Sequence, residues 1–187
     1  MYLTWEKVLN KVAVSSPKEH KTKIAYSFIL NWVHENDYKG ACHDISVVLF
    51  LVLSEIGYDC DIVIGEIKLE TGAVTDHSWI TANQLIYDIA ISKPNYPEHN
   101  HVPIFKGVAL NGDSKITCQF GVAYEGLSLE SEFVLGATII EYCHFHPKGV
   151  DFVFKLACQA LKSAGVRVSS VKLKNAYSNV KRKKSVK

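Results

Sequence analysis

Long hydrophobic segments and secretion signals are absent from this sequence of 187 residues. A membrane-spanning helix needs about eighteen or more consecutive apolar residues, and no run of the chain reaches that length. The first residues also lack the basic start, apolar stretch and cleavage site that make up a signal peptide. We therefore expect a cytoplasmic protein that makes no contact with a membrane.

A framework of paired cysteines is absent as well. The chain has 5 cysteines, an odd number, and they are scattered singly without a Cys-x-x-Cys pair. This pattern argues against a secreted fold held by disulfides and favours a reducing environment, in which a catalytic thiol stays free. A His-Glu-x-x-His zinc motif is also missing, and we expect no cofactor.

Acidic residues are missing from residues 152–187, which nevertheless carry 10 of the 21 Lys and Arg. The net charge of +2 therefore hides an acidic body with a basic end. We expect a single domain over residues 1–170 and a basic, flexible tail over residues 171–187. This tail either stays solvated, docks on the body, or contacts nucleic acid or another polyanion, because clustered lysines bind phosphates through counterion release.

The remaining composition is typical of a globular domain, with 48% hydrophobic and 21% charged residues. Hydrophobic periodicity and turn residues predict the fold class α+β, with helices packed against an antiparallel β-sheet. Besides a central helix, the predicted helices cover residues 4–14, 17–34 and 150–164, and the predicted strands cover residues 58–69, 76–80, 85–91, 104–110, 115–123 and 133–142.

The apolar run from Val47 to Leu53 predicts a buried central helix that ends at Gly57. Cys42 lies in the first turn of this helix, two residues after Gly40. The unpaired amide groups and the positive dipole at a helix N-terminus favour a thiolate over a thiol and can stabilise an oxyanion. The sequence thus predicts a buried helix that presents a reactive sulfur at one exposed end.

A hairpin downstream of this helix supplies a histidine and an aspartate. With a turn near Ala82 and Asn83, His77 and Asp88 lie almost opposite each other on neighbouring strands, within hydrogen-bonding distance. A catalytic thiolate needs a base to activate it and a third group to orient that base. Cys42, His77 and Asp88 can provide all three groups.

These residues resemble the core of the transglutaminase-like cysteine enzymes, part of the broader papain-like group. The resemblance covers residues 38–91, including the His77-x-Trp79 pair, and is closest to the small bacterial members. It implies a papain-like core in which Cys42 is the nucleophile, His77 the general base and acid, and Asp88 the orienting group. The implied activity is that of a thiol-dependent hydrolase or acyltransferase: a peptidase, an amidase or a transglutaminase-like enzyme. Its substrate would be a peptide, a protein or a small amide or ester.

The second donor of an oxyanion hole is less clear from the sequence. Covalent thiol chemistry needs such a donor beside the backbone amide of Cys42. Asn36 is a candidate because it lies a few residues upstream, although Glu35-Asn36-Asp37 also fits a polar turn that ends the preceding helix. Trp79 is expected in the core or in the wall of the cleft.

Two alternatives stay open. Cys42-His43-Asp44 and Cys143-His144-Phe145-His146 could together place four ligands around zinc, although their spacing matches no common pattern. On a helix, His43 and Asp44 should point away from the face of Cys42, which favours a solvated or capping role for both. The protein could also be a catalytically silent member of the same fold that binds a peptide or nucleic acid.

Overall fold

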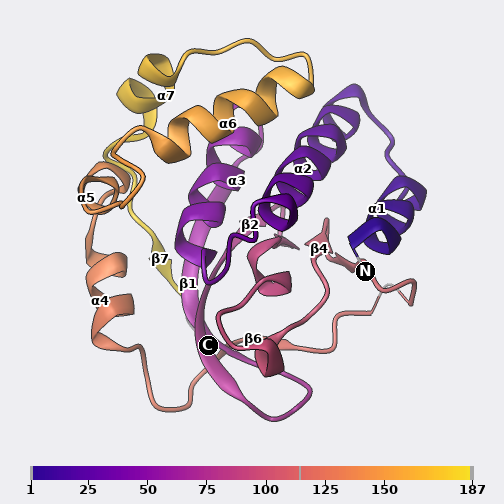
Figure 1. Ribbon diagram of the computed structural model, residues 1–187, viewed down its shortest axis with the longest axis vertical. Helices are drawn as coiled ribbons and strands as arrows, with labels where there is room; N and C mark the ends of the chain where they lie inside the picture. Colours follow the sequence, from indigo (N-terminus) through magenta and orange to yellow (C-terminus); the bar gives the residue numbers. More distant parts are fainter. Residues whose placement is uncertain (1, 114, 186–187) are drawn as a thin grey trace.

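The structure of the chain, a computed structural model, describes residues 2–113 and 115–185. Figure 1 shows helices gathered around a curled, mostly antiparallel sheet, which confirms the α+β class. The helices are α1 (Tyr2–Lys11), α2 (Pro17–Glu35), α3 (Cys42–Ile56), α4 (Leu129–Gly136), α5 (Ile139–His144), α6 (Phe152–Ser163) and α7 (Ser170–Tyr177), with 3-10 turns η1 (Ala90–Ser92) and η2 (Pro97–His99). The strands are β1 (Cys60–Lys68), β2 (Val74–Ala82), β3 (Leu85–Tyr87), β4 (Ile104–Phe105), β5 (Val108–Ala109), β6 (Gln119–Val122) and β7 (Lys183–Lys184). Within the described residues, no helix is long and apolar enough to cross a membrane.

The main sheet is built around the hairpin of β1 and β2. Its strand order is β3-β2-β1-β6, and β7 adds to β1 in the parallel sense. Gly65 of β1 lies opposite His77 of β2, and Ile80 of β2 lies opposite Tyr87 of β3. Since β3 ends at Tyr87 and the turn η1 follows, the strand predicted over residues 85–91 is too long.

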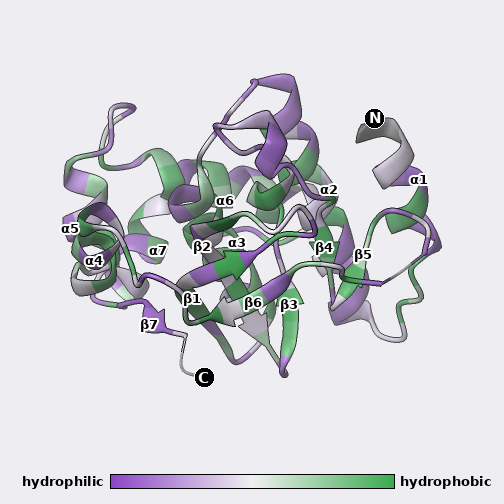
Figure 2. Ribbon diagram, turned by 90° about the horizontal axis from the view of Figure 1, so that it is seen from below, coloured by the Kyte–Doolittle hydropathy of each residue, from purple (hydrophilic) through white to green (hydrophobic). Residues whose placement is uncertain are grey.

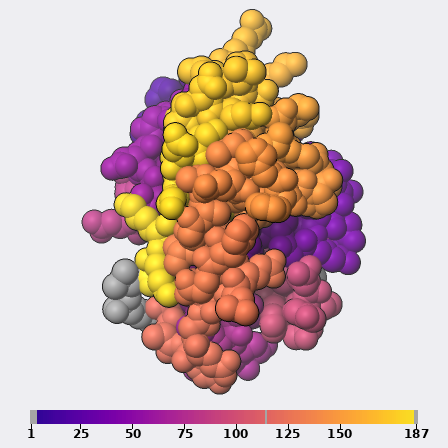
Figure 3. All heavy atoms as spheres, turned by 90° about the vertical axis from the view of Figure 1, so that its left-hand side faces the viewer, coloured from indigo at the N-terminus to yellow at the C-terminus, as the bar shows by residue number. Residues whose placement is uncertain are grey.

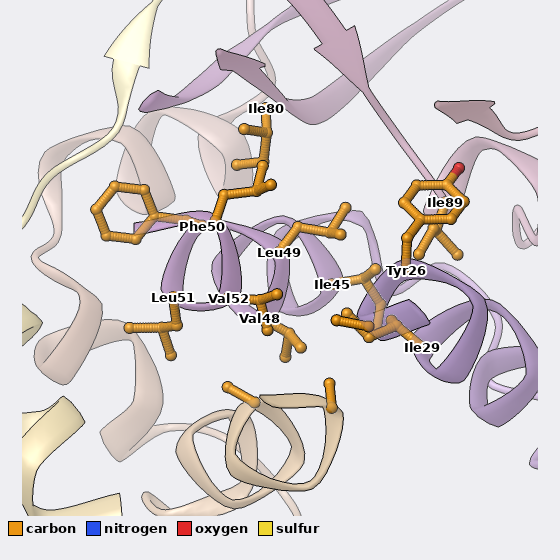
Figure 4. Close-up of a cluster of buried hydrophobic side chains, with 14 of the residues drawn as sticks. Tyr26, Ile29, Ile45, Val48, Leu49, Phe50, Leu51, Val52, Ile80 and Ile89 are labelled. Carbon is orange, nitrogen blue, oxygen red and sulfur yellow. The ribbon is translucent and has the colours of Figure 1, made fainter. Parts of the chain in front are cut away.

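α3 is the central helix and is buried on most of its sides, as its apolar run predicts. It packs against β1, β2, α2 and α6. Figure 4 shows Leu49 on the side of Ile80 and Leu51 on the opposite side of the helix. Figure 2 accordingly shows hydrophobic residues in the middle of the molecule and hydrophilic residues mostly toward its outside. Gly57 ends the helix in the left-handed conformation with a φ of 98°, which confirms the predicted end.

The later part of the chain is more helical than its sequence pattern predicts. Residues 104–110 contain the short strands β4 and β5, and residues 115–123 contain β6. The strand predicted over residues 133–142 is wrong, because this segment forms parts of α4 and α5. At the start of α5, Thr138 and Glu141 form a capping box that satisfies backbone N–H groups of the first turn. This local capping outweighs the β-like composition.

The basic, flexible tail expected over residues 171–187 is instead packed on the body over its described part, residues 171–185. This segment forms most of α7 and all of β7, and it buries Leu173 and Arg182. Figure 3 shows it running down the molecule beside the region of α4 and α5. Its lysines pair with acidic groups of the body: Lys172 with Glu55, Lys174 with Asp151, Lys183 with Asp61 and Lys184 with Glu132. Apolar burial and opposite charge therefore hold the segment in place.

Candidate active site

Cys42 lies where the sequence analysis places it, at the first residue of α3. Its side chain is partly buried and lines a cavity of about 130 Å³. His77 of β2 lines the same cavity, together with Asp76 beside it and with Asn95 from the loop after η1. The structure thus brings the predicted nucleophile and the predicted base to one small cavity.

His77 and Asp88 form a buried pair. Nε2 of His77 lies 2.6 Å from Oδ2 of Asp88. The strand register differs from the prediction, because a β3 that continued past Tyr87 would put Asp88 opposite Trp79, two residues from His77. The contact forms because residues two apart on a strand share one face, so that diagonal neighbours still meet. The predicted pair is therefore present, although its predicted cross-strand register is wrong.

Asp88 is fixed from several directions. Its Oδ1 accepts a hydrogen bond of 3.2 Å from the backbone N–H of Ile91. This bond from a side chain to the backbone three residues on closes a turn directly after the end of β3. Its backbone exchanges two hydrogen bonds with Ile104, and the hydroxyl of Tyr26 donates to its carbonyl at 2.9 Å. The carboxylate that orients His77 is therefore held by groups far apart in the sequence.

The electrostatics of the cavity favour an ion pair between Cys42 and His77. Burial alone raises the pKa of the Cys42 thiol, but His43 and His77 outweigh it and lower this pKa to about 5. Burial alone lowers the pKa of His77, but Asp88 and the Cys42 sulfur raise it to about 10. At neutral pH the arrangement therefore favours a thiolate beside an imidazolium.

His43 takes part in this site, contrary to the expectation that it points away from Cys42. Its Nδ1 lies 2.8 Å from Oγ of Ser78, which is buried on β2. This contact holds the ring beside the Cys42 sulfur, where it lowers the thiol pKa. The sequence offered no signal for it, because the position of Ser78 relative to α3 depends on how the helix packs on the sheet.

Asp44 is buried rather than solvated, which corrects the expectation for this residue as well. Its carboxylate accepts hydrogen bonds from the hydroxyls of Tyr38 at 2.5 Å and Tyr142 at 2.6 Å, and lies 3.1 Å from Nε2 of His146. Burial alone raises the pKa of Asp44, but these three partners lower it. Of the residues in the zinc alternative, Asp44 and His146 do meet, but within this tyrosine cluster. Residues 2–113 and 115–185 contain no group of three or more His, Cys, Asp or Glu placed to hold a metal ion.

Neither Asn36 nor Trp79 lines the cavity that Cys42 and His77 share. Asn36 ends α2, and its side-chain amide donates to the carbonyl of Trp32 at 2.8 Å, as expected for a polar helix end. Trp79 is 3% exposed and packs on Phe120 in a second hydrophobic cluster, which agrees with the expected core position.

Asn95 is a side-chain amide at the cavity that the sequence analysis does not single out. It lies so close to Gly40 that a Cβ at Gly40 would fall 2.2 Å from the Asn95 Oδ1. Gly40 also adopts a φ of 62° and donates its N–H to the carbonyl of Lys93 at 2.9 Å. Glycine at position 40 therefore lets this loop approach the start of α3.

No protein-family model, curated protein or solved structure matches this chain.

Proposed function

We propose that the protein is a thiol-dependent hydrolase or acyltransferase of the transglutaminase-like, papain-like type, acting on an amide or ester carbonyl. The observation that carries the proposal is the convergence of Cys42 and His77 at one cavity, with Nε2 of His77 hydrogen-bonded to the buried carboxylate of Asp88 at 2.6 Å. A nucleophile, a base and an orienting group are the three groups that thiol catalysis needs, and their proximity supports the proposal.

The first chemical step is attack of the Cys42 sulfur on the carbonyl carbon. Because Nε2 of His77 faces Asp88, Nδ1 is the ring nitrogen left to serve Cys42. The sulfur forms a bond to carbon and the carbonyl electron pair moves to oxygen. When this intermediate collapses, the bond to the leaving amine or alcohol breaks, and the leaving group takes the proton from His77.

The resulting thioester is resolved by a second nucleophile. Water or an amine gives a proton to His77 and attacks the thioester carbonyl, and the sulfur leaves as the thiolate that starts the next cycle. Hydrolysis and acyl transfer differ only in which acceptor enters the cavity.

The oxyanion in these steps needs two hydrogen-bond donors. The backbone N–H of Cys42 is one, because N–H groups in the first turn of a helix have no acceptor within the helix. We assign the second to the side chain of Asn95, which lies against Gly40 at the cavity wall. With a substrate in hand, Asn95→Ala should lower kcat by about 100-fold or more, as for other oxyanion donors. The control Asn36→Ala should leave kcat unchanged, because Asn36 caps α2.

The experiment that tests the proposal is alkylation by iodoacetamide as a function of pH, with labelling at each cysteine quantified by peptide mass spectrometry. The other four cysteines, Cys60, Cys118, Cys143 and Cys158, are internal controls, because burial raises the pKa of each of their thiols. Cys42 should label selectively below pH 7, and His77→Ala should weaken this selectivity, because His43 alone still lowers the pKa of the thiol. If Cys42 labels no faster than the partly exposed Cys158, the thiol is not activated, and a binding protein of the same fold becomes the better account.

A further inference from the structure

Arg182 reaches the catalytic helix from a distant part of the chain. It is 4% exposed and lies in a strap, defined here as residues 181–185, that includes β7. Its Nη2 donates to the carbonyl of His43 at 3.3 Å and its Nη1 donates to the carbonyl of Val134 at 3.3 Å. The centre of its guanidinium lies 4.6 Å from the ring centroid of Tyr142. One side chain thus joins the first turn of α3 to α4 and α5.

The charge of Arg182 is buried with little compensation. No carboxylate of the described residues forms an ion pair with it, and its Nε is a buried donor with no hydrogen-bond partner in that part of the chain. The acidic groups that raise the pKa of Arg182 against its burial are, in decreasing order of effect, Tyr142, Cys143, Cys42 and Asp44. Asp44 already accepts hydrogen bonds from Tyr38 and Tyr142. A buried cation is costly unless opposite charges balance it, and the Cys42 thiolate adds such a charge to that of the Asp44 carboxylate.

The strap that carries Arg182 is fitted to the sheet. The backbone N–H of Ser185 donates to the carbonyl of Ile64 at 2.8 Å, beyond the parallel pairing of β7 with β1. A Cβ at Gly65 would fall 2.7 Å from the Cβ of Ser185, and a Cβ at Gly121 would fall 2.2 Å from its Oγ. Any larger residue at these two positions would push the strap away. The glycines therefore create the space in which the strap docks.

We propose that Arg182 is a positioning residue of the Cys42 site: the docked strap places its guanidinium against the first turn of α3, where it fixes His43 and favours the thiolate. This inference rests on the proposed function, since it concerns the same nucleophile. The positive charge acts from beside the backbone carbonyl of His43, while His77 acts from the cavity. The basic segment then serves the site directly, through one buried arginine.

The test is the pH profile of Cys42 alkylation by iodoacetamide in the full chain and in two variants. Arg182→Met keeps the length of the side chain and removes the charge, and Arg182→Lys keeps a charge without the planar fork. In Arg182→Met the midpoint of the profile should rise by about 0.5 to 1 pH unit. Below the midpoint this shift corresponds to about a three- to tenfold lower rate of alkylation. Arg182→Lys should recover part of the shift. The control Lys183→Met, next in the strap but exposed, should keep the wild-type midpoint.

The other ionisable groups near Arg182 and Cys42 are the same in every variant, so they do not produce a difference in midpoint between the variants. They are His43 and Asp44 of α3, Asp76 and His77 of β2, Asp88 after β3, Tyr142 and Cys143 of α5, and Tyr38, His99 and His146 from the neighbouring turns. The free energy of unfolding in urea is measured for each variant, because a purely structural role would lower it without moving the midpoint.

Two outcomes overturn the proposal in distinguishable ways. A low midpoint in the wild type that Arg182→Met and Arg182→Lys both retain would remove Arg182 from the site and leave the proposed function intact. A wild-type midpoint near the ordinary thiol value of about 8.5, unchanged in the variants, would overturn both the proposed function and the role of Arg182. If Arg182→Met does not fold, Arg182→Lys decides alone, by a raised or an unchanged midpoint.

Discussion

Replacing Asp88 by Asn should remove the charge that keeps the buried His77 protonated. Burial alone lowers the pKa of His77, and Asp88 is the main group that raises it to about 10. Asn has nearly the same size as Asp, and its carbonyl oxygen can still accept a hydrogen bond from Nε2 of His77. The change therefore tests the charge of Asp88 with little change in shape.

The size of the effect follows from the hydrogen bond that loses its charge. A hydrogen bond to a charged group contributes about 1.5–3 kcal/mol, and one pKa unit corresponds to about 1.36 kcal/mol. Asp88→Asn should thus lower the pKa of His77 by about one to two units. Since protonated His77 helps to lower the pKa of Cys42, its loss favours the neutral thiol. The alkylation midpoint of Cys42 should therefore move upward, by up to about the same amount.

The assay is again the pH profile of alkylation by iodoacetamide, with Asp76→Asn as the matched control. Asp76 precedes His77 on β2 and lines the same cavity, but it is partly exposed and its carboxylate accepts from the backbone N–H of Ser128 at 2.9 Å. Its removal should move the midpoint little, because water screens its charge. Equal midpoints in the wild type and in Asp88→Asn would refute the reasoning, as would an equal shift in both variants.

Two further predictions concern stability. The pKa of His77 is raised from 6.5 to about 10, so its contribution to stability is complete below pH 6.5 and is lost as the pH rises through about 10. The pKa of Cys42 is lowered from 9.0 to about 5, so its contribution is complete above pH 9.0 and is lost as the pH falls through about 5. Urea unfolding of the wild type relative to the double variant Cys42→Ser/His77→Ala, which lacks both groups, should show a difference that is flat between about pH 6.5 and 9.0 and smaller on either side, and a steady slope across that range would contradict the ion pair. Gly40→Ala and Gly57→Ala should each lower the free energy of unfolding by about 1–2 kcal/mol, because both glycines have positive φ. Only Gly40→Ala should also slow Cys42 alkylation, since an added Cβ meets Asn95 at Gly40 and nothing within 4 Å at Gly57.

The central helix and the proximity of Cys42, His77 and Asp88 could be predicted from the sequence because they depend on local signals. The apolar run and Gly57 define α3, and both signals lie within the helix segment itself, so they do not depend on what packs around the helix. The pairing of His77 with Asp88 survives a register error of two residues, because side chains alternate between the faces of a strand with a period of two. A prediction that needs only the correct face is more robust than one that needs the exact partner.

The supporting residues could not be found because they depend on tertiary packing. Arg182 contacts His43, which lies 139 positions earlier in the chain, and Tyr142 contacts Asp44 across 98 positions. No periodicity or motif links such pairs. Asn95 likewise becomes a candidate only once its loop is seen against Gly40. For these residues the sequence provides the chemical groups, and the fold decides which of them meet.

Docking of the strap also changes how the basic segment should be understood. As a free tail, its lysines would attract a polyanion through counterion release. In the structure Lys183 and Lys184 pair with acidic residues of the body, and Arg182 is buried against α3. A polyanion would have to compete with the body for these cations, and pulling the strap away would withdraw Arg182 from Cys42. Polyanion contact and an activated Cys42 thiol would then oppose each other, so a ligand that engages the strap should reduce the reactivity of the thiol.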